Sequence, residues 1–531
     1  MNMGDGPRLR GRRTRGGRAM QAIALLALIL IAAPVTALAG EKTLLPEAAD
    51  PFADVVPAAM DSARDAVDRL SSVAMVVTLD PAASTIGGEM TVDWRNPAPE
   101  PLSEVWFRLF PNAFYYGDGG LAVSDLAVDG EAVRGELTLD DTALRVPLPR
   151  PVAPGARAEL TLTFTTTVPA DSKGSYGIFT HDTGNGSWVL ADWHPILAVW
   201  EEDGGWELPE VTSFGDPTYA PAVFYDVQIA APADLTVATS GIAVAEQTGN
   251  DGTITRRYIA GPARDFALVA DDDQTPQTAT TGETEIQLWT APDGDAVTNE
   301  KTLEIAAAAL RYYDETFGPY PAREIDLVET DPAGALGIAW TGLIFLDGPS
   351  LLGTYGEYDP EGLAAVVGHE VSHLWWGIQV GGDSNAHGFI QEGLATVSSI
   401  LFLEEYLGPE AAAAELDAWV IGPARDLLDE GDAIVDLPLA EGQNEGIRSD
   451  ATYGKGSLGF FAIRKEIGAE AFAAGLREAA SRYAWDEMTP EQLRGAFASA
   501  SGKDLDALWS HWFDEAAMTR DEIDAIATSF G

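Results

Sequence analysis

The sequence predicts a multidomain α+β protein, and three observations lead to that class. The 531 residues are enough for more than one domain and for a large hydrophobic core. Short β-rich runs separated by Pro, Gly and Asp turns fill the first half, whereas alanine-rich segments with helical periodicity fill the end. Strand-like and helix-like segments follow one another between these regions. We therefore expect an all-β domain, then an α+β domain, then a helical region.

The first 39 residues are predicted to be a secretory signal peptide. Arginines precede the apolar run Ala22 to Ala33, and Ala37-Leu38-Ala39 fits the small residues before a signal-peptidase cut. The run is shorter than the roughly 20 residues of a spanning helix, and retention as a membrane anchor is the alternative. We expect an exported protein, periplasmic or extracellular, with an N-terminal segment over residues 40–72.

The all-β domain is predicted over residues 73–270. Its end is marked by Asp271 to Pro276, a stretch that is charged and poor in apolar residues. The β-branched and aromatic residues typical of strands gather in several short runs. These runs are Val73 to Leu79, Glu104 to Phe110, Glu159 to Thr167 and Tyr225 to Ile229.

The α+β domain is predicted over residues 271–407, and a helical part of the same unit over 408–531. The α+β part should contain a strand at Glu283 to Thr290, a helix at Ala296 to Phe317, and strands near Ile325 and Leu343. The helical part is alanine-rich, and alanine favours helices. Its periodic segments are Pro409 to Leu428, Ser457 to Ile467 and Thr489 to Ala500.

Two histidines four residues apart stand in the run His369-Glu370-Val371-Ser372-His373. The stretch Glu361 to Trp376 lacks proline and has apolar residues at helical spacing, so it predicts a helix. Residues i and i+4 lie on one face of a helix, where both imidazoles can bind one ion. Glu370 adjoins the first histidine and can hydrogen-bond a water at that ion. The pattern predicts a zinc site with Glu370 as its general base.

A third zinc ligand is expected at Glu392, after 18 residues that follow His373. Glu392 lies in a second helix-like run, Phe389 to Leu407, and the Gly-rich loop Gly377 to Gly388 would allow the two helices to run antiparallel. Two histidines and one glutamate form a catalytic zinc set, which leaves the fourth position to water. His387 is the competing ligand. The remaining histidines have no partner at metal-ligand spacing and are expected to be structural: His181, His194 and His511.

Three segments resemble the gluzincin metallopeptidases of the aminopeptidase N and leukotriene hydrolase type. The family's HExxH, Trp-Trp-Gly and Glu-Gly-Xaa-Ala elements are matched by HEVSHLWWGIQVGGDSNAHGFIQEGLAT. Leu310 to Val328 is similar to the helix, turn and strand that precede the family's active site. Tyr453-Gly454-Lys455-Gly456 resembles its Tyr-Xaa-Lys-Gly element. The resemblance implies a thermolysin-like catalytic domain that acts on peptides, with one Zn²⁺ per chain bound by His369, His373 and Glu392.

The expected chemistry follows from the residue types. Zinc lowers the pKa of a bound water and polarises a carbonyl group, and Glu370 can accept the proton of the water and relay it to the leaving amine. A phenol aimed at the oxyanion that develops during attack lowers the barrier. The resemblance gives that role to Tyr453.

One element departs from the family's pattern. The family carries a Gly-Xaa-Met-Glu-Asn element on a strand before the zinc helix, and its glutamate binds the free α-amino group of the substrate. Aligned on Gly342-Leu343-Ile344, the glutamate position holds Ala339. The strand can still pair with the main chain of a peptide. We therefore expect peptide hydrolysis, while exopeptidase and endopeptidase action both stay open.

The net charge and the lack of cysteine limit which binding partners and metal ligands this protein can have. A formal net charge of −51 repels nucleic acid and acidic membranes, so a membrane is expected only if the N-terminal segment stays as an anchor. The absence of cysteine excludes disulfides and thiolate metal ligands. Two other classes stay open, a non-peptidase zinc hydrolase and a binding protein on a peptidase fold. The presence of both Glu370 and Tyr453 argues against the binding protein.

Overall fold

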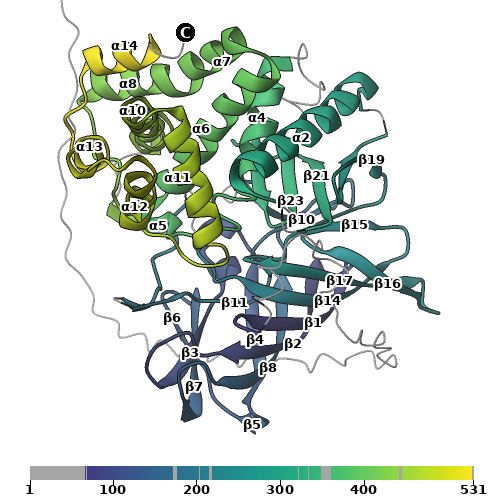
Figure 1. Ribbon diagram of the computed structural model, residues 1–531. Coiled ribbons are helices and arrows are strands. Elements are labelled where there is room, and N and C mark those ends of the chain that lie inside the picture. Colours follow the sequence, from purple (N-terminus) through teal and green to yellow (C-terminus); the bar gives the residue numbers. More distant parts are fainter. Residues whose placement is uncertain are drawn as a thin grey trace, which may run out of the picture. The chain divides into compact units, whose positions relative to one another are not determined.

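The computed structural model describes residues 66, 68–170, 176–202, 204–213, 218–292, 294–320, 322–332, 334–348, 360–441 and 445–528, which all lie in the compact unit Leu45–Gly531. The predicted signal peptide over residues 1–39 lies outside them. In Figure 1 the first part of the described chain, purple to teal, is built of strands, whereas the last part, green to yellow, is built of helices. The α+β part stands between them in sequence.

An eight-stranded sheet dominates the β-rich part. Strand β1 pairs in parallel with β14, and its other neighbour β2 is antiparallel. Val73, Met75 and Val77 of β1 are buried while Ala74 is exposed, the alternation expected of a strand with one face on the core. The strand order is β16 (Ile242–Thr248), β17 (Thr253–Ala263), β14 (Val223–Pro232), β1 (Ser71–Asp80), β2 (Thr85–Arg95), β8 (Arg157–Thr167), β4 (Gly120–Val128) and β5 (Glu131–Ala132).

Smaller sheets complete the β-rich part. One has the order β15 (Thr236–Thr239), β18 (Leu268–Asp271), β10 (Trp188–Leu190) and β9 (Phe179–His181); another has β11 (Ile196–Leu197), β3 (Leu102–Arg108), β7 (Ala143–Val152) and β6 (Glu136–Thr138). The hairpin strands are β12 (Trp200–Glu201) and β13 (Gly205–Trp206). Short 3₁₀ turns span Phe110–Asn112 and Phe114–Tyr116. These sheets and the large sheet share one hydrophobic core.

A mixed five-stranded sheet begins the α+β part. Its order is β19 (Thr275–Thr281), β20 (Thr284–Thr290), β21 (Glu324–Thr330), β23 (Leu343–Asp347) and β22 (Gly337–Trp340). Strands β20, β21 and β23 are parallel, and the continuous run of buried residues in β23 and in the middle of β21 is typical of such strands, whereas β20 alternates between buried and more exposed residues. Strand β22 is antiparallel to β23 and forms one edge of the sheet. An edge strand keeps main-chain groups available for another strand.

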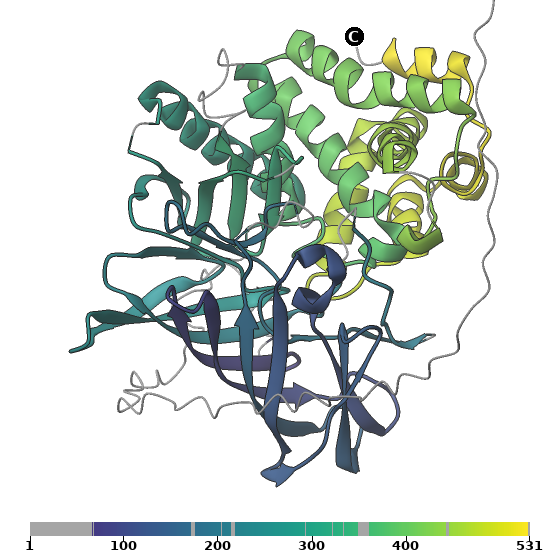
Figure 2. The same cartoon turned by 180° about the vertical axis from the view of Figure 1, so that it is seen from behind.

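Helices pack on this sheet and form the end of the chain (Figure 2). Asp295 accepts a hydrogen bond from the Thr298 amide, which fixes the start of the first long helix. The helices are α2 (Ala296–Phe317), α4 (Pro360–His373), α5 (Ser384–His387), α6 (Phe389–Tyr406), α7 (Pro409–Leu416), α8 (Gly422–Glu430), α9 (Glu445–Ser449), α10 (Ser457–Ile467), α11 (Ala469–Arg482), α12 (Pro490–Ser501), α13 (Asp506–Trp509) and α14 (Arg520–Ala527). A 3₁₀ turn spans Leu439–Glu441, and π-helices span Asp417–Ile421, Asp450–Gly456 and Ser510–Asp514.

Two predicted helices differ from the structure. The helix expected over Glu361 to Trp376 ends at His373, because the chain turns there into a loop closed by Gly377 N–H to Val380 and by Val380 N–H to Trp375. The segment expected as one helix, Pro409 to Leu428, is divided by a π-helix into α7 and α8. Apolar periodicity does not distinguish a buried turn from a helix end. No helix among the described residues has both the length and the apolar character to cross a membrane.

Candidate metal centre and active-site cavity

Helices α4 and α6 bring the three predicted zinc ligands together. Gly368 on α4 makes the close approach possible, since a Cβ atom there would lie 2.8 Å from the Phe402 ring of α6. A glycine that is unfavourable for the isolated helix therefore serves the packing of the helix pair. The Tyr313 hydroxyl of α2 donates to the Gly368 carbonyl at 2.8 Å, and its ring centroid lies 6.1 Å from that of Phe402, so α2 also packs at this point.

The donor atoms of His369, His373 and Glu392 form a triangle. The two Nε2 atoms lie 3.0 Å apart, and Glu392 Oε2 lies 3.4 Å from His369 Nε2 and 3.6 Å from His373 Nε2. Ligands about 2.1 Å from a tetrahedral zinc ion stand about 3.4 Å from one another, so the triangle has the size that zinc requires. The Nδ1 atom of His373 lies 3.0 Å from the Trp376 carbonyl oxygen and donates to it. That hydrogen bond leaves Nε2 as the metal-binding atom.

Glu370 is buried beside this triangle, with 6% of its surface exposed. A Cβ atom on Gly337 of strand β22 would lie 2.6 Å from the Glu370 carboxylate oxygen, so the backbone of β22 packs directly on that carboxylate. Burial raises the pKa of the Glu370 carboxyl group, and the nearby His369 and His373 oppose that shift. A carboxylate held in this way is suited to accept a proton next to the metal site.

Tyr453 comes from a different part of the chain. It lies on the π-helix Asp450–Gly456, and its ring centroid stands 6.3 Å from that of His369. Gly454 allows this π-helix to pack against α8, since a Cβ atom there would lie 2.8 Å from the Ala424 nitrogen. π-Turns inside helices are frequent at functional sites. The structure therefore brings all five predicted site residues to one place.

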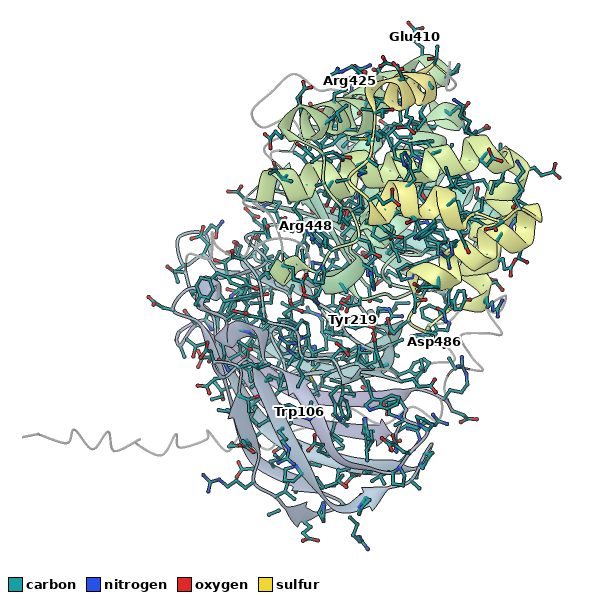
Figure 3. The ribbon with its side chains drawn as sticks, turned by 90° about the vertical axis from the view of Figure 1, so that its left-hand side faces the viewer. Trp106, Tyr219, Glu410, Arg425, Arg448 and Asp486 are labelled. Carbon is teal, nitrogen blue, oxygen red and sulfur yellow. The ribbon has the colours of Figure 1, made fainter. Side chains whose placement is uncertain are left out.

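A cavity of about 700 Å³ joins these residues to the β-rich part. Figure 3 labels two of its lining residues, Arg448 from the helical part and Tyr219, which lie between the helices and the strands. Strand β22 contributes Ile338, Ala339 and Trp340 to the wall. A peptide that pairs with this edge strand would therefore lie next to the metal triangle and Glu370.

Arg264 fixes the wall of the cavity, and the sequence interpretation gave it no role. Its guanidinium donates to the carbonyl oxygens of Ala220, Ile378 and Asp486 and, at 2.5 Å, to a carboxylate oxygen of Glu487. Arg264 lies between β17 and β18, so it ties the β-rich part to the loop after α4 and to the segment after α11. No sequence pattern signals these contacts, because the partners are far apart in the chain.

The other histidines stand outside the metal triangle. His387 Nδ1 lies 2.5 Å from Asp436 Oδ1, and this ion pair joins α5 to the loop after α8. Among the described residues, His387 belongs to no group of potential metal ligands. His181 bonds to Ser84, His194 bonds to the Pro195 carbonyl, and His511 pairs with Glu522.

Comparisons with known sequences match this chain to one peptidase family. Residues 301–512 match the peptidase family M1 domain. Aminopeptidase M1-B of Oryza sativa subsp. japonica is 25% identical over 305 residues, which cover 54% of this chain and 34% of that protein. Aminopeptidase M1 of Arabidopsis thaliana is 28% identical over 228 residues, which cover 41% of this chain and 26% of that protein. The chain thus spans about a third or less of the length of these curated relatives.

Solved structures show the same fold. A mutant of the M1 zinc metallopeptidase from Deinococcus radiodurans superposes with a TM-score of 0.60 at 19% identity, covering 85% of this chain and 94% of that one. A two-domain M1 zinc metallopeptidase mutant bound to L-tryptophan gives a TM-score of 0.62 at 20% identity, with 85% and 95% covered. The predicted β-rich, α+β and helical architecture is confirmed. Residues 301–512 thus match peptidase family M1, and the relatives and solved structures support the aminopeptidase N-type gluzincin family that the sequence resembles.

Proposed function

We propose that this protein is an exported zinc metallopeptidase that hydrolyses peptide bonds. The observation that carries the proposal is the triangle of His369, His373 and Glu392, with the buried Glu370 carboxylate beside it. The donor set and its dimensions fit one zinc ion per chain, and they keep a fourth position for water.

A bound zinc ion would lower the pKa of a water molecule and polarise the carbonyl group of the substrate. Residues of the chain align the substrate, transfer the proton and stabilise the oxyanion. Strand β22 aligns the peptide main chain by strand pairing. Glu370 accepts the proton of the attacking water and then gives it to the leaving amine, as a general base and then a general acid. The Tyr453 hydroxyl donates a hydrogen bond to the negatively charged tetrahedral oxygen, and that interaction strengthens as the charge develops.

Ala339 shapes the selectivity of this site. A glutamate that pairs with the α-ammonium group of a substrate contributes about 1.5 to 3 kcal/mol through a charge-assisted hydrogen bond. Ala339 lines the cavity on strand β22 and has no such group. Two nearby carboxylates line the wall. Asp265 accepts hydrogen bonds from Thr341 and Ser240. Glu487 accepts one from Arg264 through Oε1, while its Oε2 is buried without a hydrogen-bond partner.

We expect the enzyme to accept N-terminally blocked peptides. Zinc-loaded protein should cleave a matched set of peptides in free and N-acetylated form with kcat/KM values within about tenfold of each other, or roughly 1.4 kcal/mol. Mass spectrometry of the products gives the cleavage positions, and these decide between removal of the N-terminal residue and internal cleavage.

Three other outcomes of this assay are informative. A preference of several hundredfold for the free amine would contradict the role given to Ala339, and the variants Glu201→Gln, Glu202→Gln and Asp450→Asn would then locate the carboxylate that binds the amine. Cleavage of no peptide, with hydrolysis of another class of ester or amide, would indicate a non-peptidase zinc hydrolase. Peptide binding without hydrolysis would indicate a binding protein.

Export is proposed from the arginines, the apolar run and the small residues of the first 39 positions. N-terminal sequencing of the protein isolated from its native host is expected to begin at Gly40, after Ala39. Membrane-bound protein that retains residues 1–39 would instead identify the segment as an anchor.

A further inference from the structure

Lys455 is a fully buried lysine two residues beyond Tyr453. Its side chain has 0% exposed surface, and its ammonium group donates to Asp432 at 2.9 and 3.1 Å, to the Ala433 carbonyl at 2.7 Å and to the Glu515 carbonyl at 2.6 Å. An ammonium group has three N–H donors, and these acceptors use all of them. Removal of the Lys455 ammonium group would leave the Asp432 carboxylate buried without its opposite charge, which is destabilising.

The acceptors come from two segments far from the π-helix in sequence. Asp432 follows α8 and adopts a positive φ of 62°, an uncommon conformation for a residue other than glycine. It also accepts the Met518 amide at 2.8 Å. Lys455 and Asp432 therefore join the loop after α8 to the chain that precedes α14, and both segments hold the π-helix that carries Tyr453.

Helix geometry relates the position of the Lys455 ammonium group to the direction of the Tyr453 phenol. Residues two apart in a helix point to roughly opposite sides, because each residue turns the chain by about 100° or slightly less. Tyr453 lines the cavity while Lys455 is buried in the protein behind it. A rotation of the π-helix about its axis would move both side chains together. Fixing the ammonium group thus fixes the direction of the phenol.

We propose that Lys455 is a positioning residue that holds the Tyr453 hydroxyl toward the metal triangle. This inference rests on the proposed peptidase function, in which that hydroxyl bonds to the tetrahedral oxygen. A displacement of about 1 Å at a reacting group can cost on the order of 10²-fold in rate. If Tyr453 were not held in place, its ring would still occupy the cavity near His369, but its hydroxyl would no longer be positioned to donate to the tetrahedral oxygen.

The test is a double-mutant cycle. Lys455→Met should lower kcat at least about tenfold with little change in KM and in zinc content, and Lys455→Arg, which keeps the charge, should lose less. In a Tyr453→Phe background, Lys455→Met should cost less than about threefold, because the hydroxyl that it positions is already gone. The matched control is Lys465→Met, which removes an exposed lysine bonded to the Ala525 carbonyl and should change kcat in neither background.

Two results would overturn the proposal. One is an equal loss of kcat in the wild-type and Tyr453→Phe backgrounds, which would show that Lys455 acts on overall stability. The other is a full kcat for Lys455→Met together with a lowered Tm. Hydrogen exchange of residues 445–460 is expected to rise in Lys455→Met and not in Lys465→Met. This measurement needs no turnover. It therefore tests whether Lys455 holds the π-helix even if the wild-type protein hydrolyses no peptide.

Discussion

Glu370→Ala is expected to retain zinc and to lose on the order of 10²- to 10⁴-fold in kcat, the range attributed to a positioned general base. The carboxylate lies beside the His369, His373 and Glu392 triangle without belonging to it, so its removal leaves the donor set intact. Metal analysis and kcat for one peptide are the two measurements. Because Gly337 packs on this side chain, the alanine also creates a small void, which a Tm measurement separates from the kinetic effect.

His373→Ala is the matched comparison for that variant. It removes one donor of the triangle and the Nδ1–H bond to the Trp376 carbonyl, so most of the zinc should be lost together with turnover. Comparison of the two variants thus distinguishes the general-base role of Glu370 from the zinc-binding role of His373. Activity of Glu370→Ala equal to that of the wild type would show that another group accepts the proton.

The site depends on both local and distant contacts, and only the local ones are predictable from sequence. The spacing of His369, Glu370 and His373 is set within one helix turn, and Glu392 follows in the adjacent helix. The contact of Gly337 with Glu370 and the bonds of Lys455 to Asp432 and Glu515 join residues that share no periodic pattern. Such contacts are fixed by tertiary packing, which periodicity does not encode.

The same distinction applies to the fold. The helix Ala296–Phe317 has the predicted bounds, since Asp295 caps its start and Gly318, with φ of 120°, follows its end. The helix Ser457–Ile467 also has its predicted bounds, with Gly468 after it. The π-helices Asp417–Ile421, Asp450–Gly456 and Ser510–Asp514 have no comparable signal in the sequence. The π-helix that carries Tyr453 is therefore visible only in the structure.

Tyr453→Phe is expected to lower kcat by roughly 10²-fold or more, the scale of removing one oxyanion donor. The phenylalanine ring keeps the packing near His369, where the ring centroids are 6.3 Å apart, so substrate binding and zinc content should hardly change. A loss confined to kcat follows if the hydroxyl bonds more strongly to the transition state than to the ground state. Tyr483→Phe is the control, since Tyr483 lies at the end of α11 and is not among the residues that line the cavity. A change limited to KM would make Tyr453 a substrate-binding residue, and the cycle with Lys455 would then report on binding.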